Sequence, residues 1–88
     1  MACYLVSYDL IKNKDYNNLI KAIKAYPSWC RVLLSVWIIK SPGPATSIRD
    51  NLVKHIDYDD KLLVVKLSSE AAWIHLSDEI SNWLKANL

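Results

Sequence analysis

Residues 3–9 have the sequence CYLVSYD, and this stretch decides the fold. Its aromatic and β-branched residues favour a β-strand, with Tyr4, Val6 and Tyr8 on one face and smaller or polar residues on the other. The strand ends at Asp9, whose carboxylate we expect to be exposed. Asp9 is therefore the first candidate for a functional residue.

The chain that follows alternates between helical and strand-like patterns. Residues 16–26 have apolar side chains three and four positions apart, which predicts a helix that ends before Pro27. Residues 31–34 and 36–40 predict two strands joined by a turn near Ser35, or else one long bent strand, since the turn lacks an Asn-Gly or Asp-Gly pair.

Proline and glycine at residues 41–44 break the pattern before a second predicted helix over residues 48–56. Thr46 or Ser47 is expected to cap the start of that helix. Residues 62–67, with the sequence LLVVKL, predict the last strand.

From Glu70 onward apolar residues return to helical spacing, which predicts a third helix with Ser77 as a cap. The order strand, helix, strand, strand, helix, strand is the split βαβ pattern. We therefore predict one α+β domain over residues 1–88: a ferredoxin-like (βαββαβ) antiparallel sheet in residues 1–67 and a C-terminal helical tail in residues 68–88. Right-handed crossovers place the first two helices on one face, leaving the other for the tail or for a second copy.

Composition limits the class of protein. The 88 residues are 52% hydrophobic and 23% charged, which is typical of an ordered domain, and a chain this short buries only about 60–65% of its unfolded surface, which favours a homodimer. Without a signal peptide or a long apolar run, we expect a cytoplasmic protein with no membrane association and with Cys3 and Cys30 reduced. A single glycine argues against a phosphate-binding or dinucleotide-binding loop, so no small-molecule cofactor is expected.

Two short motifs resemble a known family. Residues 4–10, YLVSYDL, and residues 31–37, RVLLSVW, resemble the Cas2 pattern of a strand ending in Tyr-Asp-Ile and a later Arg-Val-x-x-Ser-Val-Phe. The resemblance covers roughly the first 67 residues, and the helical tail is similar to the SinR-like and VapD ribonuclease members of this wider group. Cas2-like proteins share the ferredoxin-like fold, dimerise through their sheets, and include metal-dependent nucleases as well as non-catalytic partners of the Cas1 integrase.

The resemblance implies a role for Asp9. Asp9 would be the metal-binding and catalytic acid, with Tyr8 beside it as a second catalytic residue. A carboxylate suits a hard cation such as Mg²⁺ or Mn²⁺, and two copies of Asp9 meeting near a two-fold axis could share one ion. From the residues alone, a cap for the following loop or helix is the favoured interpretation of Asp9.

Other residues are candidates for binding nucleic acid or a partner. Residues 1–44 carry six basic and two acidic side chains, a net charge of +4, which suits phosphate binding. Lys12 and Lys14 in the loop after Asp9 are candidates for this role, and the resemblance implies that Arg31 is a phosphate contact or a structural arginine. Trp37 stands where the family has Phe and is the tryptophan most expected at an interface.

Two functions remain open from the sequence. The first is a nucleic-acid-binding homodimer that cleaves RNA or DNA as a Mg²⁺- or Mn²⁺-dependent endonuclease. The alternative is a non-catalytic dimeric scaffold with a decayed nuclease site, because Asn17 and Asn18 stand where many family members have arginines and the tail is helical. A small-molecule-binding module of the same fold has no residue pattern in its favour.

Overall fold

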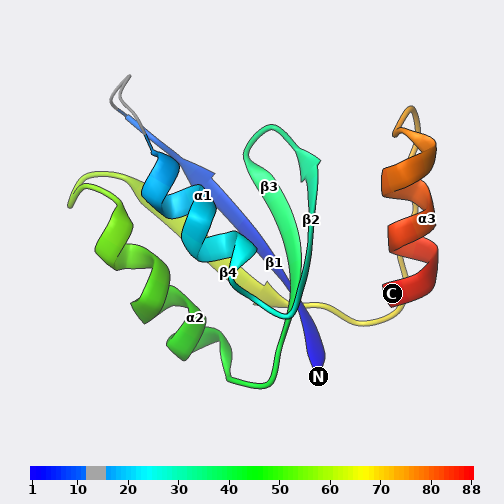
Figure 1. Ribbon diagram of the computed structural model, residues 1–88, viewed down its shortest axis with the longest axis horizontal. Helices are drawn as coiled ribbons and strands as arrows, with labels where there is room; N and C mark the ends of the chain where they lie inside the picture. Colours follow the sequence, from blue (N-terminus) through cyan, green and yellow to red (C-terminus); the bar gives the residue numbers. More distant parts are fainter. Residues whose placement is uncertain (12–15) are drawn as a thin grey trace.

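The computed structural model describes residues 1–11 and 16–88 and contains one antiparallel sheet with helices around it (Figure 1). The sheet has four strands in the order β2-β3-β1-β4, which is the order of the split βαβ fold. The predicted ferredoxin-like α+β fold with a C-terminal helix is confirmed. The elements are β1 (Ala2–Asp9), α1 (Asn17–Lys24), β2 (Ser28–Leu33), β3 (Val36–Ser41), α2 (Ala45–Leu52), the 3₁₀ turn η1 (Val53–His55), β4 (Lys61–Lys66) and α3 (Asp78–Asn87).

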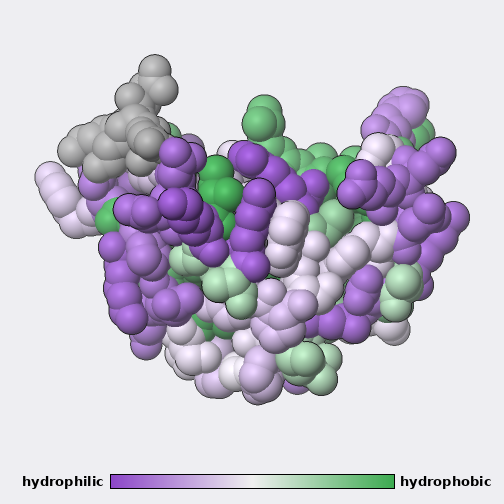
Figure 2. Space-filling model, in the orientation of Figure 1, coloured by the Kyte–Doolittle hydropathy of each residue, from purple (hydrophilic) through white to green (hydrophobic). Residues whose placement is uncertain are grey.

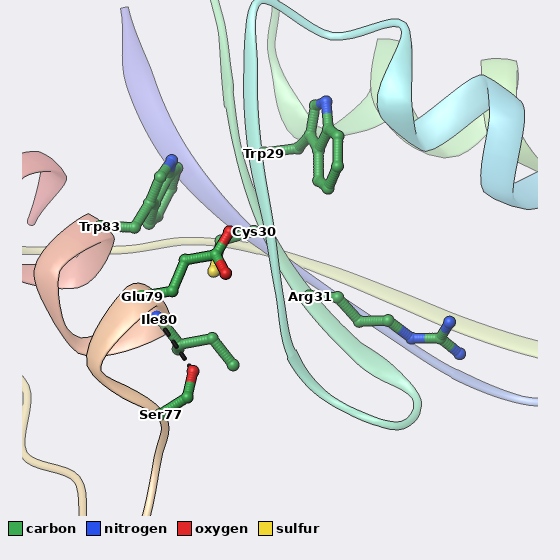
Figure 3. Close-up of a pocket in the computed structure, with 7 residues that line it drawn as sticks. All are labelled: Trp29, Cys30, Arg31, Ser77, Glu79, Ile80 and Trp83. Carbon is green, nitrogen blue, oxygen red and sulfur yellow. Dashed lines mark hydrogen bonds between the residues drawn. The ribbon is translucent and has the colours of Figure 1, made fainter.

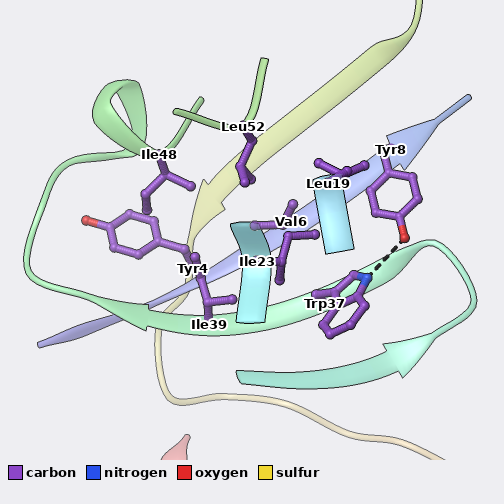
Figure 4. Packing of buried hydrophobic residues seen from close by; sticks show 9 residues of the cluster. All are labelled: Tyr4, Val6, Tyr8, Leu19, Ile23, Trp37, Ile39, Ile48 and Leu52. Atoms are coloured by element: carbon purple, nitrogen blue, oxygen red, sulfur yellow. Dashed lines mark hydrogen bonds between the residues drawn. The ribbon is translucent and has the colours of Figure 1, made fainter. Parts of the chain in front are cut away.

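The core lies between one face of the sheet and helices α1 and α2 (Figure 4). Alternation along β1 directs every second side chain towards these helices, as the sequence predicted. The helices contribute residues at three- and four-residue spacing, so both layers present apolar surfaces to each other. The buried cluster comprises Tyr4, Val6, Tyr8, Leu19, Ile23, Trp37, Ile39, Ile48 and Leu52.

Strands β2 and β3 form a hairpin whose turn is at Leu34 and Ser35, so the single bent strand is excluded. The pairing shifts register between Arg31 and Leu33, and the side chain of Arg31 donates hydrogen bonds from Nε and Nη2 to the carbonyl of Leu34 at 3.1 and 2.7 Å. Positive φ occurs among the described non-glycine residues only at His75. The turn at Leu34 and Ser35 therefore contains no residue with positive φ. It forms without the Asn-Gly or Asp-Gly pair that short hairpin turns prefer.

The start of α2 differs from the prediction. The helix begins at Ala45 with Pro44 as its N-cap, and neither Thr46 nor Ser47 caps it. The hydroxyl of Ser47 instead donates a hydrogen bond to the carbonyl of Pro44 at 2.8 Å, because Ser47 already lies inside the first turn.

The C-terminal helix begins at Asp78, directly after the predicted cap. That cap is confirmed, since the hydroxyl of Ser77 accepts a hydrogen bond from the backbone N–H of Ile80 at 3.2 Å. His75 has a φ of 62°, which a right-handed helix does not allow. The apolar spacing before Ser77 therefore belongs to an irregular segment.

Helix α3 lies beside the edge strand β2 (Figure 1), where it contacts residues of the second face of the sheet. Trp83 donates a hydrogen bond from Nε1 to the hydroxyl of Ser28 at 3.2 Å, and the thiol of Cys3 donates one to the carbonyl of Asn87 at 3.3 Å. Both cysteines are free thiols, as predicted, with Cys30 buried. In the described parts of the chain, no helix is long and apolar enough to cross a membrane.

The rest of the second face is left uncovered by the described residues. We call this region the open face. Leu33, Leu63 and Val65 are 56%, 57% and 41% exposed, and exposed apolar residues also gather over the β2–β3 hairpin at the top of Figure 2. Helices α1, α2 and α3 present mainly hydrophilic residues in the same view. The open face consists of Leu5, Ser7, Leu33, Val36, Leu63 and Val65.

Candidate functional site

Asp9 is the last residue of β1 and is exposed, as the sequence predicted. It shares a face of the strand with Leu5 and Ser7, so it lies at the border of the open face. Within the described parts of the chain, its carboxylate forms no hydrogen bond or ion pair. A depression of about 190 Å³ lies around it, lined by Ser7, Tyr8, Asp9, Lys61, Leu62 and Leu63.

Lys61 is the cross-strand partner of Asp9 and was not identified from the sequence. Its ammonium group gives the depression a cation that can attract phosphate. The sequence did contain a signal for it. Lys61 immediately precedes the predicted strand over residues 62–67, and antiparallel pairing with β1 brings the start of that strand to Asp9.

Tyr8 points away from Asp9, into the helix-covered core. Its hydroxyl accepts a hydrogen bond from Nε1 of Trp37 at 3.0 Å (Figure 4). Successive residues of a strand face opposite sides of the sheet, so the structure does not bring the Tyr8 hydroxyl to the Asp9 carboxylate. The hydrogen bond anchors the end of β1 and thereby supports the position of Asp9.

Trp37 is 1% exposed and belongs to the core. We expected Trp37 at an interface. Its side chain instead points towards α1 and α2 and is buried there, so it does not agree with that role. Arg31 lies over the Trp37 ring, with its guanidinium carbon 5.1 Å from the ring centroid. Because Arg31 also donates two hydrogen bonds to Leu34, its contacts are those of a structural arginine, and it does not lie beside Asp9.

The predicted phosphate contacts Lys12 and Lys14 lie outside the described residues. Ile11 and Tyr16, which flank that segment in the sequence, are both held by the carboxylate of Asp60. Asp60 accepts a hydrogen bond from the backbone N–H of Ile11 at 2.9 Å and another from the hydroxyl of Tyr16 at 3.0 Å. Ile11 and Tyr16 are therefore both held next to the start of β4, close in sequence to Lys61.

The environment of Tyr16 is electrostatically unusual. Burial raises the pKa of its hydroxyl to about 12, with further contributions from the hydrogen bond to Asp60 and from the carboxylates of Asp60, Asp57 and Asp59. All these effects disfavour the tyrosinate form. Tyr16 therefore stays neutral at physiological pH and serves as a hydrogen-bond donor to Asp60.

One chain offers a divalent cation a single carboxylate at this site. Among the described residues, no group of three or more His, Cys, Asp or Glu side chains is arranged to hold a metal ion. Mg²⁺ is commonly bound in proteins by one or two carboxylates together with water and substrate phosphate. Asp9 supplies one such carboxylate, and a second chain would supply another.

Comparison with known proteins identifies one family. A family model described as CRISPR associated protein Cas2 matches residues 1–74. The match covers the whole four-stranded sheet and both helices that pack on it, and it ends before α3. Searches of curated proteins and of solved structures each found no match.

Proposed function

Because the chain belongs to the Cas2 family of CRISPR-associated proteins, we propose that it is a nucleic-acid-binding homodimer that cleaves RNA or DNA phosphodiester bonds with Mg²⁺ or Mn²⁺. Proteins of this family typically dimerise and bind nucleic acids. The observation that carries the proposal is the unpaired, exposed carboxylate of Asp9 at the border of the open face.

The open face supports a two-fold dimer. A second copy packed on it would remove exposed Leu33, Leu63 and Val65 from water, and each fully buried side chain of this size contributes about 1.5–3 kcal/mol. A two-fold interface uses the same surface of both chains. Since Asp9 borders that surface, the two copies of Asp9 come close if the axis passes near the ends of the β1 strands.

Each residue around Asp9 has a distinct part in this proposal. The two Asp9 carboxylates hold the divalent cation, which supplies Lewis-acid activation of water and of the phosphate when bound. Lys61 attracts the scissile phosphate, and Lys12 and Lys14 bind phosphates farther along the strand. Tyr8 acts as a positioning residue through its hydrogen bond to Trp37.

The test is metal-dependent cleavage by purified wild type and Asp9→Asn, each incubated with labelled single-stranded RNA and duplex DNA in Mg²⁺, Mn²⁺ or chelator. We expect chelator to abolish cleavage and Asp9→Asn to lower the rate by about 100-fold or more, because the substitution removes a charged ligand. Glu70→Gln, at an exposed residue after β4, is the matched control and should cleave like wild type. Equal rates for wild type and Asp9→Asn would reject a catalytic role for Asp9.

A non-catalytic dimeric scaffold is the second candidate. It is favoured by the single carboxylate at the site and by Asn17 and Asn18, which give α1 amides at positions where basic residues would strengthen phosphate binding. This function predicts a dimer that binds nucleic acid without cutting it in any of the metal conditions. Cleavage that depends on Asp9 would exclude it.

A further inference from the structure

A cleft of about 350 Å³ lies between β2 and α3 (Figure 3). This volume is within the range of small-ligand sites. The cleft shares no lining residue with the depression around Asp9, so an inference about it does not rest on the proposed nuclease function. Its lining residues are Trp29, Cys30, Arg31, Ser77, Glu79, Ile80 and Trp83.

Glu79 gives the cleft a negative charge. Among the described residues, its carboxylate forms no ion pair or hydrogen bond. Burial raises the pKa of the neighbouring Cys30 thiol, and the charge of Glu79 raises that pKa further. The thiol therefore remains neutral, and Glu79 supplies the anionic charge on this side of the cleft.

Arg31 does not neutralise Glu79. Its side chain extends away from Glu79 in Figure 3, donates to the carbonyl of Leu34, and lies over the ring of Trp37. Three contacts thus fix the guanidinium at the hairpin. The carboxylate is left facing the cleft with no cation of its own chain among the described residues bound to it.

Two indole rings flank Glu79 in the close-up view (Figure 3). Trp29 is 38% exposed and already attracts a cation, since Nζ of Lys24 lies 5.1 Å from its ring centroid. The hydrogen bond from Trp83 to Ser28 fixes the second indole. Indole rings attract cations through their electron-rich faces and pack well against methylene groups.

We propose that this cleft binds a primary alkylammonium group, as carried by polyamines and by the lysine side chains of proteins. The ammonium pairs with the carboxylate of Glu79, and its methylene chain packs against Trp29, Trp83 and Ile80. An unpaired carboxylate between two indoles matches this combination of positive charge and apolar stem. A neutral alkyl chain of equal length cannot form an ion pair with the carboxylate of Glu79.

The test is a titration of the full chain followed by the amide and indole N–H signals in nuclear magnetic resonance spectra. The probes are spermidine, Nα-acetyl-lysine N-methylamide and the neutral 1,6-hexanediol. We expect saturable shifts of the Trp83 indole signal with both amines and none with the diol. Glu79→Gln should weaken amine binding at least 10-fold, with an unchanged circular dichroism spectrum.

Asp78→Asn is the matched control, because Asp78 lies in the same first turn of α3 but does not line the cleft. It should bind both amines as wild type does. Tighter binding of spermidine would identify a polyamine as the ligand, and tighter binding of the lysine compound would identify a protein side chain. Shifts that persist in Glu79→Gln, equal shifts with the diol, or no shift with either amine would overturn the proposal.

Discussion

Asp9 and Asp60 have opposite relations to their surroundings although both lie at the same end of the sheet. Asp60 accepts hydrogen bonds from Ile11, Tyr16 and the backbone N–H of Asp57, and it holds the chain in place. Asp9 forms none within the described residues and remains available to a ligand. In the sequence, both residues are acids next to polar loops. The position of Asp9 at the end of a predicted strand indicated that it could be functional. The role of Asp60 could not be predicted, because it depends on contacts between segments far apart in the chain.

The raised pKa of Tyr16 predicts a pH dependence of stability. The folded-state pKa of about 12 exceeds the ordinary value of 10.0, so the neutral hydroxyl stabilises the fold fully below pH 10, and this contribution is lost as the pH rises from 10 towards 12. The free energy of unfolding in urea should therefore fall more steeply with pH in this range for wild type than for Tyr16→Phe. The difference in tyrosinate absorbance between these two proteins should titrate near pH 12.

Asp60→Asn tests the contribution of Asp60 to that pKa shift, because the asparagine keeps the size of the side chain and the burial of Tyr16 but removes the charge. The Tyr16 titration should move towards pH 10 in this variant. A wild-type difference titration already centred on pH 10 would show that Tyr16 does not occupy the environment described here.

At the scale of elements, the sheet and its two covering helices follow from local sequence patterns. Alternation along β1, helical spacing in α1 and the break at residues 41–44 indicated each element to within a few residues. The predicted cap Ser77 placed the start of α3 correctly, but the helical spacing of apolar residues over residues 70–76 was misleading, because the backbone there is not helical. The spacing of apolar residues indicates which side chains can share a face. It does not indicate the positive φ of His75, which prevents a helix from extending through residues 70–76.

The N-cap of α3 provides a test of how this helix is joined to the domain. Ser77→Ala removes the acceptor for the N–H of Ile80 and should lower the free energy of unfolding by about 0.5–2 kcal/mol, whereas Ser77→Asp should retain most of the stability. Urea unfolding monitored by tryptophan fluorescence measures both. If neither variant changes the transition, α3 unfolds separately from the sheet rather than as part of it.

At the scale of the whole molecule, one face of the sheet is covered by α1 and α2 and the other only in part by α3. The sequence predicted that a tail or a second copy would cover this second face, and α3 proves to cover the β2 side while the open face stays exposed. Lys61, Asp9 and the open face meet at one end of the sheet. A single sequence could not indicate which part of the second face α3 leaves exposed, since that depends on how the tail packs against the sheet.

In the proposed dimer, two Asp9 carboxylates from two chains form one divalent-cation site. The number of ions bound per chain tests this arrangement, because each chain contributes one of the two carboxylates. Val65→Asp places a charge in the open face, outside the depression around Asp9, and should give a monomer that binds the cation poorly. Val53→Asp, at an exposed position on the helix side of the domain, should remain a wild-type dimer.

The most direct measurement is the number of Mn²⁺ ions bound per chain, determined by electron paramagnetic resonance titration together with the mass from sedimentation equilibrium. We expect one Mn²⁺ for every two chains of wild type and Val53→Asp, and loss of that site in Asp9→Asn and in monomeric Val65→Asp. One ion per chain, or unchanged binding in Asp9→Asn, would contradict a site shared by two Asp9 carboxylates.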